Sequence, residues 1–122
     1  MNKILLTLFL LLSFQVSAMD RSFESSMNFN TRDVFGFVKE LDQKYNFGID
    51  HDQIEVITLY PAVGEDFSTM LDISYNGKPS KVEYRVYMED KGSPSIYFYF
   101  ESKELSDLVS SFMREWAQAK GL

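Results

Sequence analysis

Apolar residues recur at helical spacing in two segments of the chain. The first segment carries a stripe in the i, i+3, i+4, i+7, i+11 pattern of an amphipathic helix: Val34, Phe37, Val38, Leu41 and Tyr45. Asn30 or Thr31 can cap the start of this helix, and Gly48 can end it. The second stripe consists of Leu105, Leu108, Val109, Phe112, Met113 and Trp116. Ser102 can cap this second helix and Gly121 can end it, so we expect one helix near each end of the domain.

Four runs between these helices have the composition or the alternation of β-strands. Residues 54–60 are rich in β-branched side chains and stop at Pro61, and residues 67–75, 81–88 and 95–101 alternate between two faces. Asn76 and Gly77 form a type I′ turn signal, because both central residues of that turn need a positive φ. We therefore expect four strands, with a tight hairpin between the second and the third.

The hairpin also predicts which residues face each other. A two-residue turn at positions 76 and 77 pairs residues whose numbers sum to 153. On one face the expected pairs are Leu71 with Val82 and Thr69 with Tyr84, and on the other they are Asp72 with Lys81 and Met70 with Glu83. Apolar residues then meet apolar ones and opposite charges meet, which favours this register.

These elements predict an α+β fold in the order α-β-β-β-β-α. The expected architecture is a two-layer sandwich, in which a four-stranded antiparallel meander carries the N- and C-terminal helices on one face. Residues 30–122 would form this single domain, and the polar residues 19–29 would be a flexible lead-in.

The first 18 residues have the pattern of a secretory signal peptide. Lys3 gives a short positive start, residues 4–12 are apolar except for Thr7, and residues 16–18 (Val-Ser-Ala) precede an expected cut after Ala18. The apolar run is about half the 20 residues of a membrane-spanning helix. We therefore expect export and cleavage, and a periplasmic location is favoured because the chain has no cysteine for disulfides.

Charge and composition narrow the function classes. The chain has 12 Lys and Arg against 18 Asp and Glu, a formal charge of −6, which argues against a nucleic-acid partner. The absence of cysteine removes thiol nucleophiles and cysteine-based zinc sites. The single histidine, His51, lacks further nitrogen or sulfur ligands and is expected in a loop. We expect no catalytic residue, no cofactor, no metal and no membrane contact after cleavage; the protein is not expected to be an enzyme.

The face of the sheet without helices holds the candidate binding residues. Tyr87, Tyr97 and Tyr99 would lie there, because the core side of these strands takes the alternate residues. Tyrosine combines a large apolar ring with a hydroxyl that tolerates water and is frequent in protein contacts. The alternatives are that these residues form a contact surface, or that they reflect the high β-propensity of tyrosine on a solvated sheet.

Two loops add a second candidate feature. In a meander, the connections before the second and before the fourth strand emerge at one end of the sheet, which would gather Glu65, Asp66, Glu89 and Asp90. These carboxylates are either ordinary turn residues or an acidic projection that steers the molecule onto a basic partner.

With its leader, its acidic cysteine-free body, the Tyr97-Phe98-Tyr99-Phe100 strand and the helix over residues 105–116, the chain resembles periplasmic immunity proteins of the type VI secretion system. The resemblance is to the small proteins that neutralise a spike-fused (VgrG-linked), lysozyme-like peptidoglycan hydrolase. It implies an inhibitor that binds the cognate hydrolase effector and blocks its substrate groove. The four loop carboxylates would then enter or rim the groove, and the three tyrosines would supply either the anchor area or a homodimer interface.

Two other function classes fit the sequence. The first alternative is a periplasmic adaptor or chaperone that binds envelope proteins through the open sheet face. The second is a small hydrolase, although no nucleophile elbow and no phosphate-binding glycine motif is present.

Overall fold

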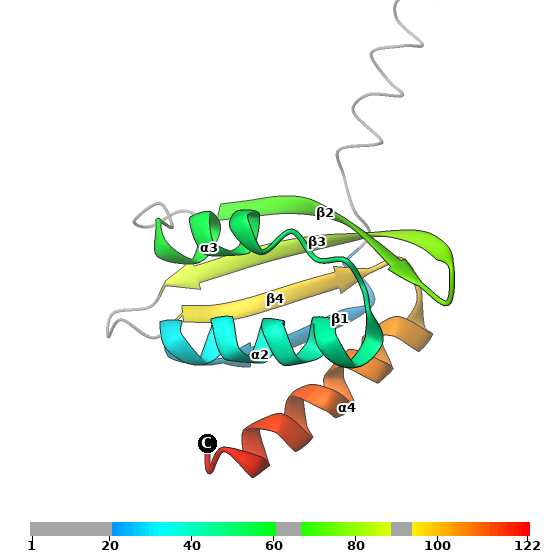
Figure 1. The fold of residues 1–122 in the computed structure, drawn as a ribbon. Helices are drawn as coiled ribbons and strands as arrows, with labels where there is room; N and C mark the ends of the chain where they lie inside the picture. Colours follow the sequence, from blue (N-terminus) through cyan, green and yellow to red (C-terminus); the bar gives the residue numbers. More distant parts are fainter. Residues whose placement is uncertain (1–20, 61–66, 89–93) are drawn as a thin grey trace, which may run out of the picture.

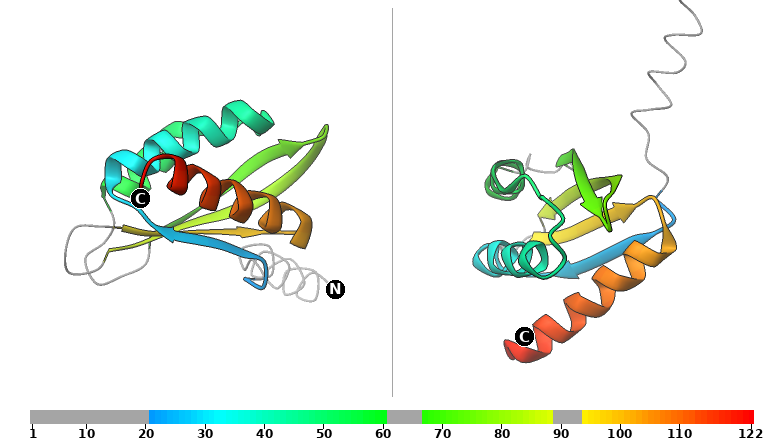
Figure 2. Two further views of the ribbon diagram at one scale, coloured as in Figure 1. Left: turned by 90° about the horizontal axis from the view of Figure 1, so that it is seen from below. Right: turned by 45° about the vertical axis from the view of Figure 1, so that its right-hand side comes forward.

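A four-stranded antiparallel sheet carries three helices on one face in the computed structural model, which describes residues 21–60, 67–88 and 94–122 (Figures 1 and 2). The elements are β1 (Glu24–Asn28), α2 (Thr31–Tyr45), α3 (His51–Leu59), β2 (Phe67–Tyr75), β3 (Lys78–Met88), β4 (Pro94–Phe100) and α4 (Lys103–Ala119). The strands lie in the order β1-β4-β3-β2. The predicted α+β class and four-stranded antiparallel sheet are confirmed.

The hairpin between β2 and β3 has the predicted register. Leu71 pairs with Val82, Thr69 with Tyr84, Asp72 with Lys81 and Met70 with Glu83. Asn76 and Gly77 have φ angles of 52° and 76°, as a type I′ turn requires. β2, β3 and β4 form the expected meander.

The predicted strand over residues 54–60 is wrong, because most of this segment belongs to helix α3. Asp50 caps the helix: its carboxylate accepts a hydrogen bond from the backbone N–H of Gln53 at 3.2 Å. Ile54 and Thr58 then lie one turn apart and are both buried against the sheet. The burial that this i, i+4 pair gains outweighs the β-propensity of the run.

The expectation of a flexible lead-in over residues 19–29 is also wrong where the structure describes it. β1 pairs with β4 along its whole length, from Glu24 opposite Tyr99 to Asn28 opposite Ser95. The order of the described elements is therefore β-α-α-β-β-β-α, with β1 added to the free edge of the meander, rather than α-β-β-β-β-α.

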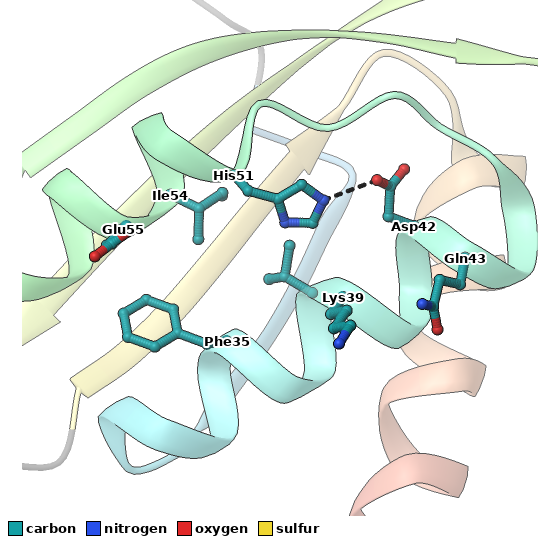
Figure 3. A pocket seen from close by; sticks show the side chains of 8 residues that line it. Phe35, Lys39, Asp42, Gln43, His51, Ile54 and Glu55 are labelled. Carbon is teal, nitrogen blue, oxygen red and sulfur yellow. Dashed lines mark hydrogen bonds and ion pairs between the residues drawn. The ribbon is translucent and has the colours of Figure 1, made fainter.

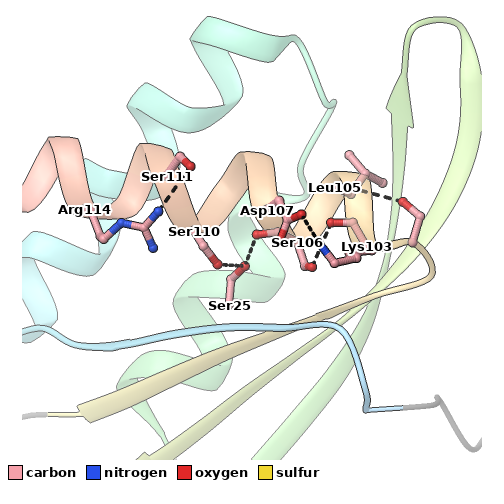
Figure 4. A network of polar contacts seen from close by, with 9 residues as sticks. Ser25, Lys103, Leu105, Ser106, Asp107, Ser110, Ser111 and Arg114 are labelled. Carbon is pink, nitrogen blue, oxygen red and sulfur yellow. Dashed lines mark hydrogen bonds and ion pairs between the residues drawn. The ribbon is translucent and has the colours of Figure 1, made fainter.

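A serine network fastens β1 to α4 (Figure 4). Ser25 is 1 % exposed; its hydroxyl donates to the carbonyl of Ser106 at 2.8 Å and lies 2.7 Å from the hydroxyl of Ser110. The short, polar β1 segment is held because these bonds satisfy its buried hydroxyl.

Both predicted helices are confirmed, with their caps. Asn30 accepts from the N–H of Asp33 at 2.9 Å at the start of α2, and Ser102 accepts from the N–H of Leu105 at 3.2 Å at the start of α4. α2 ends at Tyr45, earlier than expected, because the cap residue Asn46 takes a left-handed conformation (φ 55°) and closes the helix before Gly48.

The helical layer lies on the predicted face of the sheet. α3 packs over β2 and β3, α4 packs over β1 and β4, and α2 lies between the two other helices (Figure 2). Trp116 of α4 packs edge-on against Phe29 and Phe37, with ring centroids 5.4 Å and 5.7 Å apart. A Cβ on Gly36 would lie 3.4 Å from the Trp116 ring, at the limit of ordinary van der Waals contact, so the indole packs closely against α2 at this position.

Candidate functional site: the open face of the sheet

The second face of the sheet is not covered by any of the described helices, and it presents the alternate residues of all four strands. Two of the predicted tyrosines form its centre. The rings of Tyr97 and Tyr99 stack with centroids 6.2 Å apart and planes 7° apart. Tyr87 lies on β3 opposite Ser95 and is 42 % exposed. The structure thus places all three tyrosines on the predicted face and brings two of them into ring contact.

Arg21, which lies before the first strand, holds the carboxylate of Glu83 on this face. Both side-chain nitrogens of the Arg21 fork donate to the Glu83 carboxylate, each at 3.1 Å. The side chain of Glu83 is 8 % exposed and that of Arg21 is 48 % exposed. The pair is therefore a two-point, charge-assisted contact with one partner buried, which gives it a defined geometry.

Arg21 also connects this ion pair to the aromatic rings. Its guanidinium carbon lies 5.4 Å from the centroid of the Tyr99 ring, within the range of a cation–π contact. Tyr99 is 7 % exposed. Burial raises the pKa of the Tyr99 phenol and the nearby Glu24 carboxylate adds to this rise, while Arg85 and Arg21 lower the pKa in part. A hydrogen bond to the Glu24 side chain also raises the pKa, so the phenol stays protonated at neutral pH and its proton is bound within the chain.

Arg21 is the site residue that the sequence did not indicate. It lies in the segment interpreted as a lead-in, three residues before β1. Once β1 is placed beside β4, the Glu24–Tyr99 pair and the Tyr99–Glu83 pair bring Arg21 near both of its contacts. Prediction of Arg21 as a site residue therefore requires the pairing of β1 with β4, and no short-range sequence pattern indicates that pairing.

The four predicted loop carboxylates, Glu65, Asp66, Glu89 and Asp90, lie outside the described residues. The strand ends that flank the two loops do lie at one end of the sheet, because Phe67 pairs with Val86 and Met88 pairs with Pro94. The gathering of the carboxylates remains a prediction.

A second candidate is a groove of about 630 Å³ between α2 and α3 (Figure 3). His51 does not lie in a loop, as expected, but is the first residue of α3, and its Nε2 lies 2.8 Å from Oδ2 of Asp42. The backbone N–H groups of Gly48 and Ile49 donate to Oδ1 of the same carboxylate, at 2.8 Å and 3.3 Å. This contact ties the end of α2 to the start of α3.

The charges and hydrogen bonds in the groove indicate that the Asp42–His51 pair has a structural role. Partial burial raises the pKa of Asp42, but the hydrogen bond from His51, the two backbone amides and the charge of His51 together hold it below its usual value. The residues that line the groove are Phe35, Val38, Lys39, Asp42, Gln43, His51, Ile54 and Glu55. This lining contains no serine, threonine or cysteine, so no hydroxyl or thiol nucleophile from it lies beside the Asp42–His51 pair.

The described ranges, residues 21–60, 67–88 and 94–122, contain neither a metal cluster nor a membrane-spanning helix. No group of three or more His, Asp or Glu side chains in these ranges is placed to hold a metal ion. None of the helices there has the length and apolar character needed to cross a membrane.

No protein-family model, curated protein or solved structure matches this chain. Its function is therefore inferred from the geometry of the open face.

Proposed function

We propose that this protein is a periplasmic immunity protein that binds a cognate peptidoglycan-hydrolase effector of the type VI secretion system through the open face of its sheet. Binding would block the substrate groove of the hydrolase. The observation that supports this proposal best is the joined cluster of Arg21, Glu83, Tyr97 and Tyr99. Arginine and tyrosine are the residue types that most often carry the binding energy of protein interfaces.

The cluster is already ordered before a partner arrives. Arg21 holds Glu83 at two points, and the Tyr99 ring contacts both the Arg21 guanidinium and the ring of Tyr97. Ordering a rotamer-rich side chain on binding costs about 0.5–1.5 kcal/mol, and side chains fixed in advance avoid most of this cost. A preordered surface suits an inhibitor that holds one partner tightly.

The charge of the chain supports a basic partner. The formal charge is −6, and loss of the leader removes only Lys3 among the charged residues. A hydrolase that holds the anionic peptidoglycan polymer needs basic residues in its groove, so opposite charges would speed the encounter. The acidic loop residues Glu89 and Asp90 would act in this steering. Their reversal to lysine should slow association and weaken its dependence on salt.

The decisive experiment is a lysis assay in the periplasm. A spike-fused, lysozyme-like hydrolase encoded beside this chain is expressed with and without it, and co-expression should prevent lysis. Absence of protection contradicts the proposal. Binding of several unrelated envelope proteins, each weakly, would favour the adaptor function instead.

A variant series tests whether the open face makes the contact. Tyr97→Ala and Tyr99→Ala should each weaken binding of the purified hydrolase domain by about 30-fold, which corresponds to about 2 kcal/mol. Leu59→Ala is the control, because Leu59 is 44 % exposed and lies in α3 of the helical layer, one turn after Glu55. Equal affinities for all three variants would exclude the open face as the binding surface.

A further inference from the structure

The outer edge of β2 carries backbone groups that the described part of the chain does not pair. β2 is the last strand of the sheet, with β3 on one side only. Tyr75 and Lys78 close the two-residue turn and exchange hydrogen bonds, so the odd-numbered residues of β2 bond to β3. The even-numbered residues therefore direct their N–H and C=O groups outward.

The backbone N–H of Ser74 confirms that the even-numbered residues point outward. The N–H of Ser74 donates to the carbonyl of Phe47 at 2.8 Å, which closes the edge at the hairpin end. Ser68, Met70 and Asp72 have the same orientation and continue the edge. Unpaired edges are usually protected by charged side chains, especially lysine, by proline or by a bulge. This stretch has no proline and no lysine, and its one charged residue, Asp72, is paired with Lys81 within the chain.

Helix α3 places apolar side chains beside the same edge. The side-chain amide oxygen (Oε1) of Gln53 accepts a hydrogen bond from the Thr69 hydroxyl at 2.6 Å, which marks the side of α3 that faces β2. Val56 and Tyr60 follow Gln53 at i+3 and i+7, so they lie on that side, and they are 56 % and 71 % exposed. The opposite side of α3, with Glu55, lines the groove toward α2.

We propose that this edge binds a second copy of the same chain. The two β2 strands would pair antiparallel about a two-fold axis at Met70, which joins the two sheets into one and brings the two α3 helices together. The register is self-complementary. Met70 lies opposite the second Met70, and Ser68 lies opposite the second Asp72, so a hydroxyl donor meets a carboxylate twice.

The charges on β2 favour a second copy of the chain in this register. Asp72 forms a 2.8 Å ion pair with Lys81 in its own chain, so its charge is balanced before the strands meet. No like charges face each other within Ser68, Met70 and Asp72. The tyrosine face stays free in such a dimer, which assigns dimerisation to the β2 edge and leaves the open face for the hydrolase.

Sedimentation of the mature protein alone tests the dimer, independently of any hydrolase. The protein should sediment as a dimer. Met70→Lys should shift it to a monomer, because two lysines would then face each other across the axis. Ser74→Lys is the matched control on the same strand and face, and it should leave the dimer intact because the Ser74 N–H is bound within the chain. A monomeric wild-type protein at all concentrations up to about 1 mM would overturn the proposal.

Cysteine cross-linking tests the register, since the natural chain has no cysteine. Directly opposite residues of a hydrogen-bonded pair have Cα atoms about 5.5 Å apart, which a disulfide can span. Met70→Cys should cross-link on mild oxidation and Ser74→Cys should not. A mixture of Ser68→Cys and Asp72→Cys chains should give the heterodimer. Cross-linking of Ser74→Cys instead would assign the edge to another contact.

Discussion

Thr58 and Tyr84 form the buried polar contact on which the position of α3 depends. The Thr58 hydroxyl donates to the carbonyl of Ile54 at 2.6 Å, and its oxygen lies 2.7 Å from the Tyr84 hydroxyl. Since the threonine proton is directed at Ile54, Tyr84 is the donor in the second bond. Tyr84 has no exposed surface and Thr58 is 1 % exposed. Removal of the threonine oxygen therefore leaves a buried phenol without an acceptor.

The expected losses of stability differ between the two positions, because only removal of the threonine oxygen leaves a buried donor without an acceptor. Thr58→Val keeps the shape of the side chain but leaves the Tyr84 donor unsatisfied, which should lower the free energy of unfolding by about 1–3 kcal/mol. Tyr84→Phe removes the donor and leaves the bond from Thr58 to Ile54, so about 0.5–1.5 kcal/mol should be lost. The double variant has no orphaned group, and its loss should be clearly smaller than the sum of the single losses.

Urea unfolding followed by circular dichroism measures these differences, provided that the slopes of the four transitions agree. A coupling free energy of about 1 kcal/mol between the two positions is the expected result. Strictly additive losses, or a Thr58→Val variant as stable as the wild type, would refute the inference that this contact fixes α3 to the sheet.

The same phenol makes stability depend on alkaline pH. Burial raises the pKa of Tyr84 far above its ordinary value of 10.0, although the bond to Thr58 opposes this rise. The unfolded chain loses the proton first, so this contribution is complete below pH 10 and is lost as the pH rises further. Between a pH below 10 and pH 11, the free energy of unfolding should fall by about 1.4 kcal/mol more for the wild type than for Tyr84→Phe. Urea unfolding of both proteins under the two conditions measures this difference. Parallel stability curves for the two proteins would contradict this.

Three further outcomes test contacts elsewhere in the fold. Asp42→Asn should flatten the acid side of the stability curve, because the lowered pKa of Asp42 contributes stability above its unfolded value of 3.8 that is lost as the pH falls through the folded value; urea unfolding across the acid range checks this. Ser25→Ala should cost about 1 kcal/mol and speed hydrogen exchange in β1, since it removes the bonds to α4. Gly77→Ala should cost about 1–2 kcal/mol in thermal unfolding, because φ is +76° there.

The parts of the fold that the sequence predicted are those set by short-range patterns. The hairpin register follows from Asn76 and Gly77 together with the alternation beside them, and every predicted pair is present. The two helices follow from apolar stripes with a capping residue at the start. In each case, turn chemistry, capping and burial favour the same structure within one segment.

The segment over residues 54–60 was misjudged because its local preferences conflict. Ile54, Val56, Ile57 and Thr58 favour a strand by propensity, and the hydrophobic periodicity of the run is weak for a helix. Burial decides the outcome, since Ile54 and Thr58 reach the sheet only from a helix, while Val56 stays exposed. No pattern within the segment contains that information, because the partner of Thr58 is Tyr84, 26 residues further along the chain.

The open face depends on contacts of the same long-range kind. The tyrosines were placed correctly because strand alternation alone fixes the face on which a residue lies. The order of that face depends on Arg21, which reaches Glu83 across 62 residues of sequence and does so only because β1 pairs with β4. If export removes the leader after Ala18, Arg21 becomes the third residue of the mature chain. The proposed binding surface would then be completed by the new N-terminal segment. The ordered position of Arg21 on this surface therefore depends on the pairing of β1 with β4. Ser25 is the buried residue that bonds β1 to α4, so it supports the binding surface from the other face of the sheet.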